Sequence, residues 1–104
     1  MEKRRPHYDL AKVKALILAE AYRVTRTALD TAYRDFGVTE PGEIAREVLA
    51  VAMRDFRKSM TTYSDSSLWQ DVYGAIVRGV KAYVKVQIVS ETTVIISFKE
   101  DTEE

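Results

Sequence analysis

In the absence of clustered carboxylates, lysine and tyrosine are the candidate acid-base groups of this 104-residue chain, and glutamine is a candidate for orienting a substrate. The chain has no cysteine and a single histidine, His7. Thiol nucleophiles, zinc sites built on thiolates and catalytic pairs of histidines are therefore excluded. Asp65 and Asp71 are isolated carboxylates, which we interpret as a turn former and a strand-end polar group. We therefore predict no metal and no other cofactor, and we interpret His7, which follows Pro6, as a surface residue rather than an acid.

Two expected strands near the end of the chain bring tyrosine and lysine together. In residues 80–89 the apolar residues alternate with polar ones, so Tyr83, Lys85 and Gln87 share the face opposite the core. In residues 94–99 we expect Val94, Ile96 and Phe98 to face the core and Ile95, Ser97 and Lys99 to lie opposite.

The register between these two strands follows from the same alternation. A three-residue loop at 90–92 pairs Ile88 with Val94, Val84 with Phe98, and Tyr83 with Lys99. The sequence therefore predicts a phenol beside an ammonium, with Lys85 on the same face.

Helices are predicted in the first half of the chain. Apolar residues at helical spacing indicate one helix from Leu10 to Ala21 capped by Asp9, a second from the Thr25 cap to Gly37, and a third that opens at Thr39 and Pro41 and extends to Ala52. After Phe56 the period falls to two, which predicts strands near 58–62, 69–73, 80–89 and 94–99. Residues 64–67 and 74–79 are expected to be connections. Helices followed by strands indicate the α+β class.

Length and charge limit the organisation of the chain. We expect residues 1–104 to form one domain with a short acidic tail at 100–104. The tail carries −4 and the rest +4, so the tail is either a solvated end or a shield for a basic site. Apolar runs such as 15–19 are too short to span a bilayer, and Lys12 and Lys14 interrupt any signal peptide, so we expect no membrane association and a cytoplasmic protein.

Four segments resemble the MqsR family of type II toxins. They are "EKRRPH" from residue 2, "KSMTTYSD" from residue 58, "WQDVY" from residue 69 and "ISFKE" from residue 96. This resemblance implies a RelE-like α+β fold with N-terminal helices on a mainly antiparallel sheet. It also implies a metal-independent, sequence-selective endoribonuclease that cleaves mRNA and is neutralised by a cognate, MqsA-like antitoxin.

The resemblance also implies a set of active-site residues. The family's catalytic positions fall on Lys58, Gln70, Tyr83 and Lys99. We expect further contacts to RNA from four residues of the same segments, namely Arg57, Met60, Tyr63 and Lys85.

The chemistry implied is attack of a ribose 2′-hydroxyl on the adjacent phosphate, which gives a 2′,3′-cyclic phosphate. Either Lys58 or Lys99 is the base, because neighbouring cations favour a neutral amine, and the other lysine holds the phosphoryl oxygens. Tyr83 can donate or accept a proton, and Gln70 can orient the phosphate or the hydroxyl.

Two other functions stay open from the sequence. One is a catalytically weak member that binds RNA without cutting it, because Arg57 adds a guanidinium where we associate the family with an aromatic ring. The other is a protein-interaction module whose sheet edge pairs with another chain.

Overall fold

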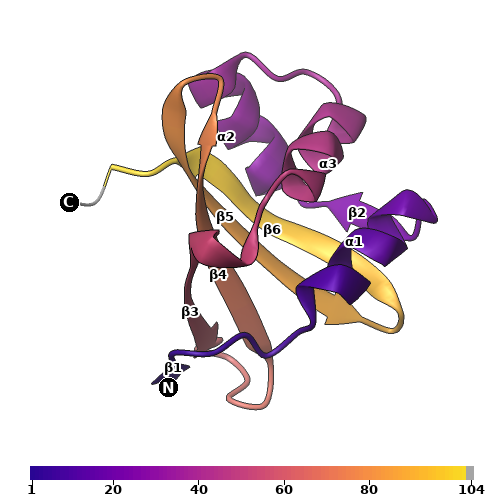
Figure 1. Cartoon of the computed structure of the whole chain (residues 1–104), viewed down its shortest axis with the longest axis vertical. Coiled ribbons are helices and arrows are strands. Elements are labelled where there is room, and N and C mark those ends of the chain that lie inside the picture. Colours follow the sequence, from indigo (N-terminus) through magenta and orange to yellow (C-terminus); the bar gives the residue numbers. More distant parts are fainter. Residues whose placement is uncertain (103–104) are drawn as a thin grey trace.

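Three helices and a six-stranded sheet make up the structure, a computed structural model that describes residues 1–102 (Figure 1). The elements in chain order are β1 (Glu2–Lys3), α1 (Leu10–Leu18), β2 (Tyr22–Val24), α2 (Arg26–Phe36), α3 (Pro41–Leu49), a 3₁₀ turn (Met53–Asp55), β3 (Phe56–Thr61), β4 (Trp69–Val77), β5 (Val80–Val89) and β6 (Thr92–Glu100). The predicted α+β class, with N-terminal helices on a mainly antiparallel sheet, is confirmed. None of the helices in the described part of the chain is long and apolar enough to cross a membrane.

The sheet has the strand order β1-β3-β4-β5-β6-β2, and only the β2–β6 pair is parallel. The two outer strands, β1 and β2, were not predicted, because segments of two and three residues carry no alternation that could reveal them. Lys3 in β1 lies opposite Ser59 in β3. The basic start of the chain is therefore held at one edge of the sheet, beside β3 (Figure 1).

The predicted helix caps are correct, but two predicted helix ends are wrong. Asp9 accepts a hydrogen bond from Ala11 N, and Thr25 accepts one from Ala28 N. Helix α1 ends at Leu18 rather than at Ala21, since the chain must turn so that the Ala21 carbonyl can accept from Thr93 N in β6.

The end of the third helix was also predicted too late. Helix α3 stops at Leu49, and Val51 and Ala52 lie beyond it. Ala52 N donates to Asp55 Oδ2 at 2.8 Å, which forms the tight turn that leads into β3. The second helix ends as predicted, because Gly37 adopts the left-handed conformation (φ 69°) that stops it.

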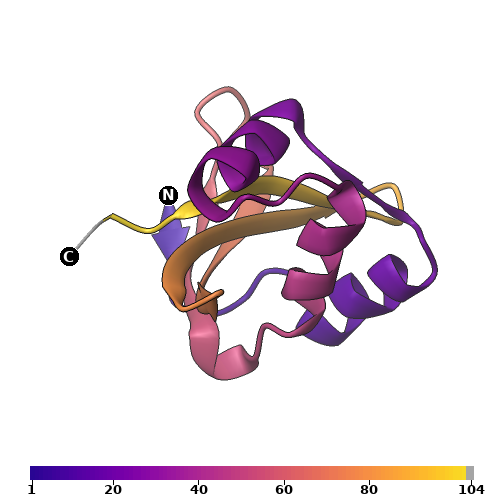
Figure 2. The ribbon, with the colours of Figure 1, turned by 90° about the horizontal axis from the view of Figure 1, so that it is seen from above.

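All three helices pack on one face of the curved sheet, as Figures 1 and 2 show together. The core contains apolar side chains of every helix and of β4, β5 and β6. Phe36 of α2 and Phe98 of β6 meet edge-to-face, with ring centroids 5.4 Å apart. The opposite face of the sheet carries no helix.

Strand β4 is longer than predicted. Residues 74–79 were expected to connect two strands, but Gly74 to Val77 continue β4 and pair with β5. The connection is the two-residue turn Arg78–Gly79, in which both residues have positive φ. The expectation failed because a glycine inside the strand was interpreted as a loop signal.

The β5–β6 hairpin combines a shorter loop than predicted with a β-bulge. Ser90 and Glu91, both at positive φ, form a two-residue turn, so Ile88 lies opposite Thr93 rather than Val94. A register shift then occurs beside Ile96, between the Lys85–Ser97 and Val86–Ile95 pairs. The bulge restores the predicted pairs of Tyr83 with Lys99 and Val84 with Phe98.

The bulge also changes which β6 residues face the core. Ile95 and Phe98 both belong to the core, whereas Val94 and Ile96 do not. The predicted inward face of Val94, Ile96 and Phe98 is therefore correct only for Phe98. The extra residue at a bulge reverses the alternation, and a sequence pattern of period two does not reveal it.

Asp71 fastens the N-terminal segment to the sheet. Its carboxylate is fully buried and accepts hydrogen bonds from His7 N at 3.0 and 3.1 Å and from Tyr8 N at 2.9 Å. The hydroxyl of Tyr8 donates in turn to Trp69 O at 2.8 Å. The prediction that Asp71 is a strand-end polar group was wrong, because β4 continues past it and its side chain points under the first helix rather than into solvent.

We predict that Asp71→Asn lowers the free energy of unfolding by about 1 to 3 kcal/mol, because an amide group would face backbone donors that need an acceptor. Urea denaturation measures this change. The matched control is Asp30→Asn, which alters an exposed carboxylate on α2 and should change stability by less than about 0.5 kcal/mol. Equal unfolding midpoints for the two variants would contradict the role of Asp71.

Candidate active site

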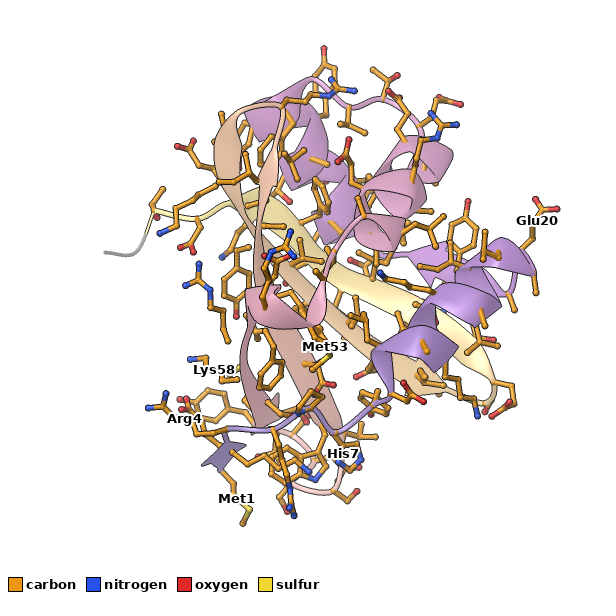
Figure 3. The ribbon with its side chains drawn as sticks, viewed as in Figure 1. Met1, Arg4, His7, Glu20, Met53 and Lys58 are labelled. Atoms are coloured by element: carbon orange, nitrogen blue, oxygen red, sulfur yellow. The ribbon has the colours of Figure 1, made fainter. Side chains whose placement is uncertain are left out.

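The face of the sheet without helices presents a group of cations, a phenol and two amides. Alternate residues of β3, β4, β5 and β6 point to this side, which we call the open face. They form three rows across the strands, named here after Tyr83, Lys85 and Gln70. In Figure 3 the labelled Lys58 projects on the side that the helices leave free.

The Tyr83 row joins β4, β5 and β6. Gly74 lies opposite Tyr83, and Tyr83 lies opposite Lys99. Lys99 Nζ is 5.1 Å from the centroid of the Tyr83 ring, a cation–π contact. The predicted pair of a phenol and an ammonium is therefore confirmed.

The Lys85 row lies next to it, in the middle of the open face. Lys58 lies opposite Val72, Val72 opposite Lys85, and Lys85 opposite Ser97. Val72 is only 2% exposed although no helix covers this side. The aliphatic stems of Lys58 and Lys85, its cross-strand neighbours, are placed to cover it.

The Gln70 row is the third. Met60 lies opposite Gln70, and Gln70 Nε2 donates to Gln87 Oε1 at 3.3 Å. Gln87 was expected on this face but was not predicted to hold Gln70. This bond fixes the side on which Gln70 presents its own amide oxygen.

Arg57 reaches the open face through a bulge in β3. The register shifts between Phe56 and Lys58, so Phe56 packs its ring on Tyr73 at the core while Arg57 and Lys58 both reach the other side. The Arg57 guanidinium lies over Gly74, where a Cβ would come within 2.6 Å of its Cζ and Nε atoms. Glycine at position 74 thus makes room for Arg57.

Lys58 has a carboxylate partner from the unpredicted strand β1. Glu2 Oε2 lies 3.3 Å from Lys58 Nζ, and both side chains are partly exposed. A salt bridge of this kind between partly exposed groups contributes little to stability.

Lys85 differs from the other lysines of the face in its surroundings. Its side chain is half-buried. Burial is the main cause that lowers the pKa of Lys85, and the charges of Lys99 and Lys58 lower it further. The pKa of Lys85 therefore lies below the ordinary value of a lysine, which makes its neutral form more accessible.

Two shallow hollows flank Tyr83 and are of a size to hold a phosphate. One, of about 210 Å³, is lined by side chains that include Arg57, Lys58 and Lys81. The other, of about 270 Å³, is lined by Lys99 and by residues of α2 and the end of the chain. Asp101 borders both hollows, while Glu103 and Glu104 of the predicted acidic tail lie outside the described residues.

Seven of the eight predicted site residues share the open face, and Tyr63 does not join them. Tyr63 is fully exposed in the β3–β4 loop and borders a separate hollow of about 260 Å³ with Met60. Asp65 in that loop accepts bonds from Ser67 N and Oγ, which agrees with its predicted role as a turn former. These bonds lower the pKa of Asp65.

His7 lies on the other side of the sheet, among the residues of the N-terminal segment. Its ring stacks on Trp69 with centroids 5.5 Å apart, and its Nδ1 is 2.9 Å from Lys3 Nζ. Partial burial and the Lys3 charge lower the pKa of His7. Its exposed position away from the open face agrees with the interpretation of His7 as a surface residue.

Glu2, Gly74 and Gln87 are the site residues that sequence reasoning missed. Glu2 and Gly74 could not be placed, because strand β1 and the extension of β4 were not predicted. Gln87 could have been found, since alternation already put it on the face of Tyr83. The arrangement as a whole can bind an oxyanion with several cations, orient it with an amide and exchange a proton with it.

The sequence of this chain is similar to those of known proteins. A family model described as motility quorum-sensing regulator, toxin of MqsA, matches residues 5–100. The chain is also 41% identical over 100 residues to the mRNA interferase toxin MqsR of Escherichia coli (strain K12), which covers 96% of this chain and 99% of that protein. The chain therefore belongs to the MqsR toxin family.

Proposed function

We propose that this chain is the toxin of a toxin–antitoxin system and cleaves mRNA at selected sequences, without a metal, by attack of the 2′-hydroxyl on the neighbouring phosphate. The observation that carries the proposal is the convergence of Lys58, Tyr83, Lys99 and Gln70 on one open face. Membership in a toxin family, and the name mRNA interferase of the relative at 41% identity, support the same function.

Each residue has a role that follows from its position. Lys58 and Lys99 are cations on opposite sides of the face, so they hold the phosphoryl oxygens, whose negative charge grows in the transition state. Tyr83 lies between the two hollows and gives a proton to the leaving 5′-oxygen. Gln70, fixed by Gln87, orients the scissile phosphate with its amide.

A metal-independent reaction is supported by the side chains available. The chain has no cysteine and one histidine, and within residues 1–102 no three His, Asp or Glu side chains gather as metal ligands would. The substrate supplies its own nucleophile in this mechanism. No water-activating ion is then required, and the products are a 2′,3′-cyclic phosphate and a 5′-hydroxyl.

The partner that we propose is an MqsA-like antitoxin, and the location is the cytoplasm, where mRNA is found. The description of the matching family as the toxin of MqsA supports this partner. Co-expression with the product of the adjacent gene, followed by purification through a tag on one chain, tests it. Recovery of the toxin without the second chain would contradict the proposed partner.

We predict that Lys58→Met, Tyr83→Phe and Lys99→Met each lower the rate of RNA cleavage on the order of a hundredfold or more, because each removes a charge or a proton from the transition state. Gln70→Ala should lower the rate less, since an amide contributes neither a charge nor a transferable proton. Single-turnover cleavage of an unstructured RNA, with mapping of both product ends, measures these effects.

The controls for that experiment test the mechanism itself. Activity should persist in EDTA, and a single 2′-deoxy sugar at the scissile position should abolish the cut there. Loss of activity in EDTA, or normal cleavage at the deoxy position, would contradict the mechanism. Binding of the RNA by the unmodified chain without any product would identify the non-cleaving alternative.

We also predict that Gly74→Ala weakens RNA binding as much as Arg57→Gln does, on the order of tenfold, because the new methyl group displaces the guanidinium from the phosphate site. The double variant should show no additional loss. Titration of a fluorescent 2′-O-methyl RNA, which the protein cannot cut, measures the affinities at one salt concentration.

The matched control is Gly42→Ala on α3, where a Cβ would meet only Tyr22 Oη at an ordinary 3.9 Å. This variant should bind RNA as the unmodified chain does. Additive losses in the double variant would show that Gly74 does not act through Arg57.

A further inference from the structure

We infer that the amine of Lys85 is the base that takes the proton from the 2′-hydroxyl, while Lys58 and Lys99 hold the phosphate on either side of it. This inference rests on the proposed ribonuclease function and assigns one step of it. Neither the matching family description nor the name of the relative assigns a role to Lys85.

The position of Lys85 is the first argument. It stands in the middle row of the open face, on the strand that also carries Tyr83, and only Val84 separates the two residues along that strand. Lys99 comes from the neighbouring strand β6, and Lys58 comes from β3, on the far side of β4. A phosphate held between these two cations therefore lies above Lys85, and the ribose attached to it is within reach of the amine.

The charged groups around Lys85 are the second argument. β3 contributes Arg57 and Lys58, and β6 contributes Lys99, all of them positive. β4 contributes Gln70 and Val72, which carry no charge. On β5 itself the same-face neighbours are Tyr83 and Gln87, and beyond Tyr83 the strand also carries Lys81.

Two carboxylates near the face bind other groups. Glu2 pairs with Lys58, and Asp71 is buried under the opposite face, where it binds backbone amides. Asp101 borders the hollows beside Tyr83. The salt bridges of residues 1–102 do not include Lys85.

This environment favours a neutral amine at Lys85. Burial and the charges of Lys99 and Lys58 all lower the pKa of Lys85. As the pH rises through this lowered pKa, the neutral fraction of Lys85 increases, so a rate that depends on it as a base must also increase.

The step balances with the groups of the open face alone. The lone pair of Lys85 Nζ takes the 2′-proton, and the 2′-oxygen forms a bond to phosphorus. The bond from phosphorus to the 5′-oxygen breaks, and that oxygen takes the phenolic proton of Tyr83. The products are a 2′,3′-cyclic phosphate and a 5′-hydroxyl, and water then returns the proton from the Lys85 ammonium to the Tyr83 phenolate.

The first test exploits the absence of cysteine from the chain. Lys85→Cys creates a single thiol, and alkylation with 2-bromoethylamine converts it to a lysine analogue in which sulfur replaces a methylene and the amine is less basic. We expect Lys85→Met and Lys85→Arg to lose on the order of a hundredfold in single-turnover rate, because a guanidinium stays protonated. Alkylated Lys85→Cys should recover to within about tenfold of the unmodified rate, with the rising part of its pH–rate profile moved to lower pH.

Two controls accompany these variants. Lys12→Gln removes an exposed lysine on α1 that pairs with Glu91, far from the open face, and should keep the full rate. The unmodified chain treated with 2-bromoethylamine should also keep its rate, since it has no thiol. Affinity for 2′-O-methyl RNA separates a loss of binding from a loss of chemistry.

The second test does not depend on cleavage. NMR titration of ¹³C-labelled lysine, with the Lys85 signal identified by its absence in Lys85→Arg, reports the protonation of Lys85 directly. We expect Lys85 to titrate below the ordinary pKa of a lysine, and at higher pH in Lys99→Met than in the unmodified chain, because a neighbouring like charge is removed.

The outcomes distinguish this inference from the proposed function. If the unmodified chain cuts RNA to cyclic phosphate ends while Lys85→Arg keeps its rate, or while Lys85 titrates at the ordinary pKa of a lysine, the inference is wrong and the proposed function stands. If the unmodified chain does not cut RNA, both are wrong. Recovery of activity in alkylated Lys85→Cys, together with the low titration of Lys85, supports both.

Discussion

The pleat of four long strands, covered by helices on one face only, determines where every group of the site lies. Side chains of β3 to β6 must alternate between a face that packs under α1, α2 and α3 and a face that contacts solvent. Core packing therefore determines which residues face inward, and the residues that alternate with them must face outward. The positions of Lys58, Tyr83, Lys85 and Lys99 depend on the burial of Val84, Phe98 and their neighbours as much as on their own contacts.

Two bulges modify this pleat, and both lie next to the site. The bulge at Arg57 brings two consecutive cations to the same side, and the bulge beside Ile96 lets Ile95 and Phe98 both face inward while Lys99 stays opposite Tyr83. An uninterrupted ladder from the Ser90–Glu91 turn would have placed Lys99 on the wrong face. The site is thus the product of regular alternation and two local exceptions to it.

Alternation and capping residues made much of the fold and part of the site predictable. Asp9, Thr25 and Gly37 fixed helix boundaries because each has one physical role there. The pairing of Tyr83 with Lys99 was predicted correctly, although for a different reason. The prediction assumed a three-residue loop, whereas the molecule has a two-residue turn and a bulge. Both arrangements give the same register beyond the bulge. The roles of Glu2 and Gly74 could not be predicted from the sequence. The role of a two-residue strand, or of a glycine that makes room for an arginine, depends on contacts between segments far apart in the sequence.

The net charge of the chain is zero, but its positive and negative side chains are unevenly distributed. This distribution determines which charges surround each lysine of the open face. Glu2 pairs with Lys58 at the edge of this face, and Asp71 binds the N-terminal segment on the opposite side of the sheet. Asp101 borders the hollows beside Tyr83. Lys85 then has Lys99 on the neighbouring strand β6 and Lys58 on β3 beyond β4, and its side chain is partly buried. Like charges held together raise the free energy of the folded state, and the apolar core on the other face of the same strands must offset that cost. The same sheet therefore carries both the apolar core that stabilises the fold and the neighbouring cations that lower the pKa of Lys85, the residue that we infer to be the base.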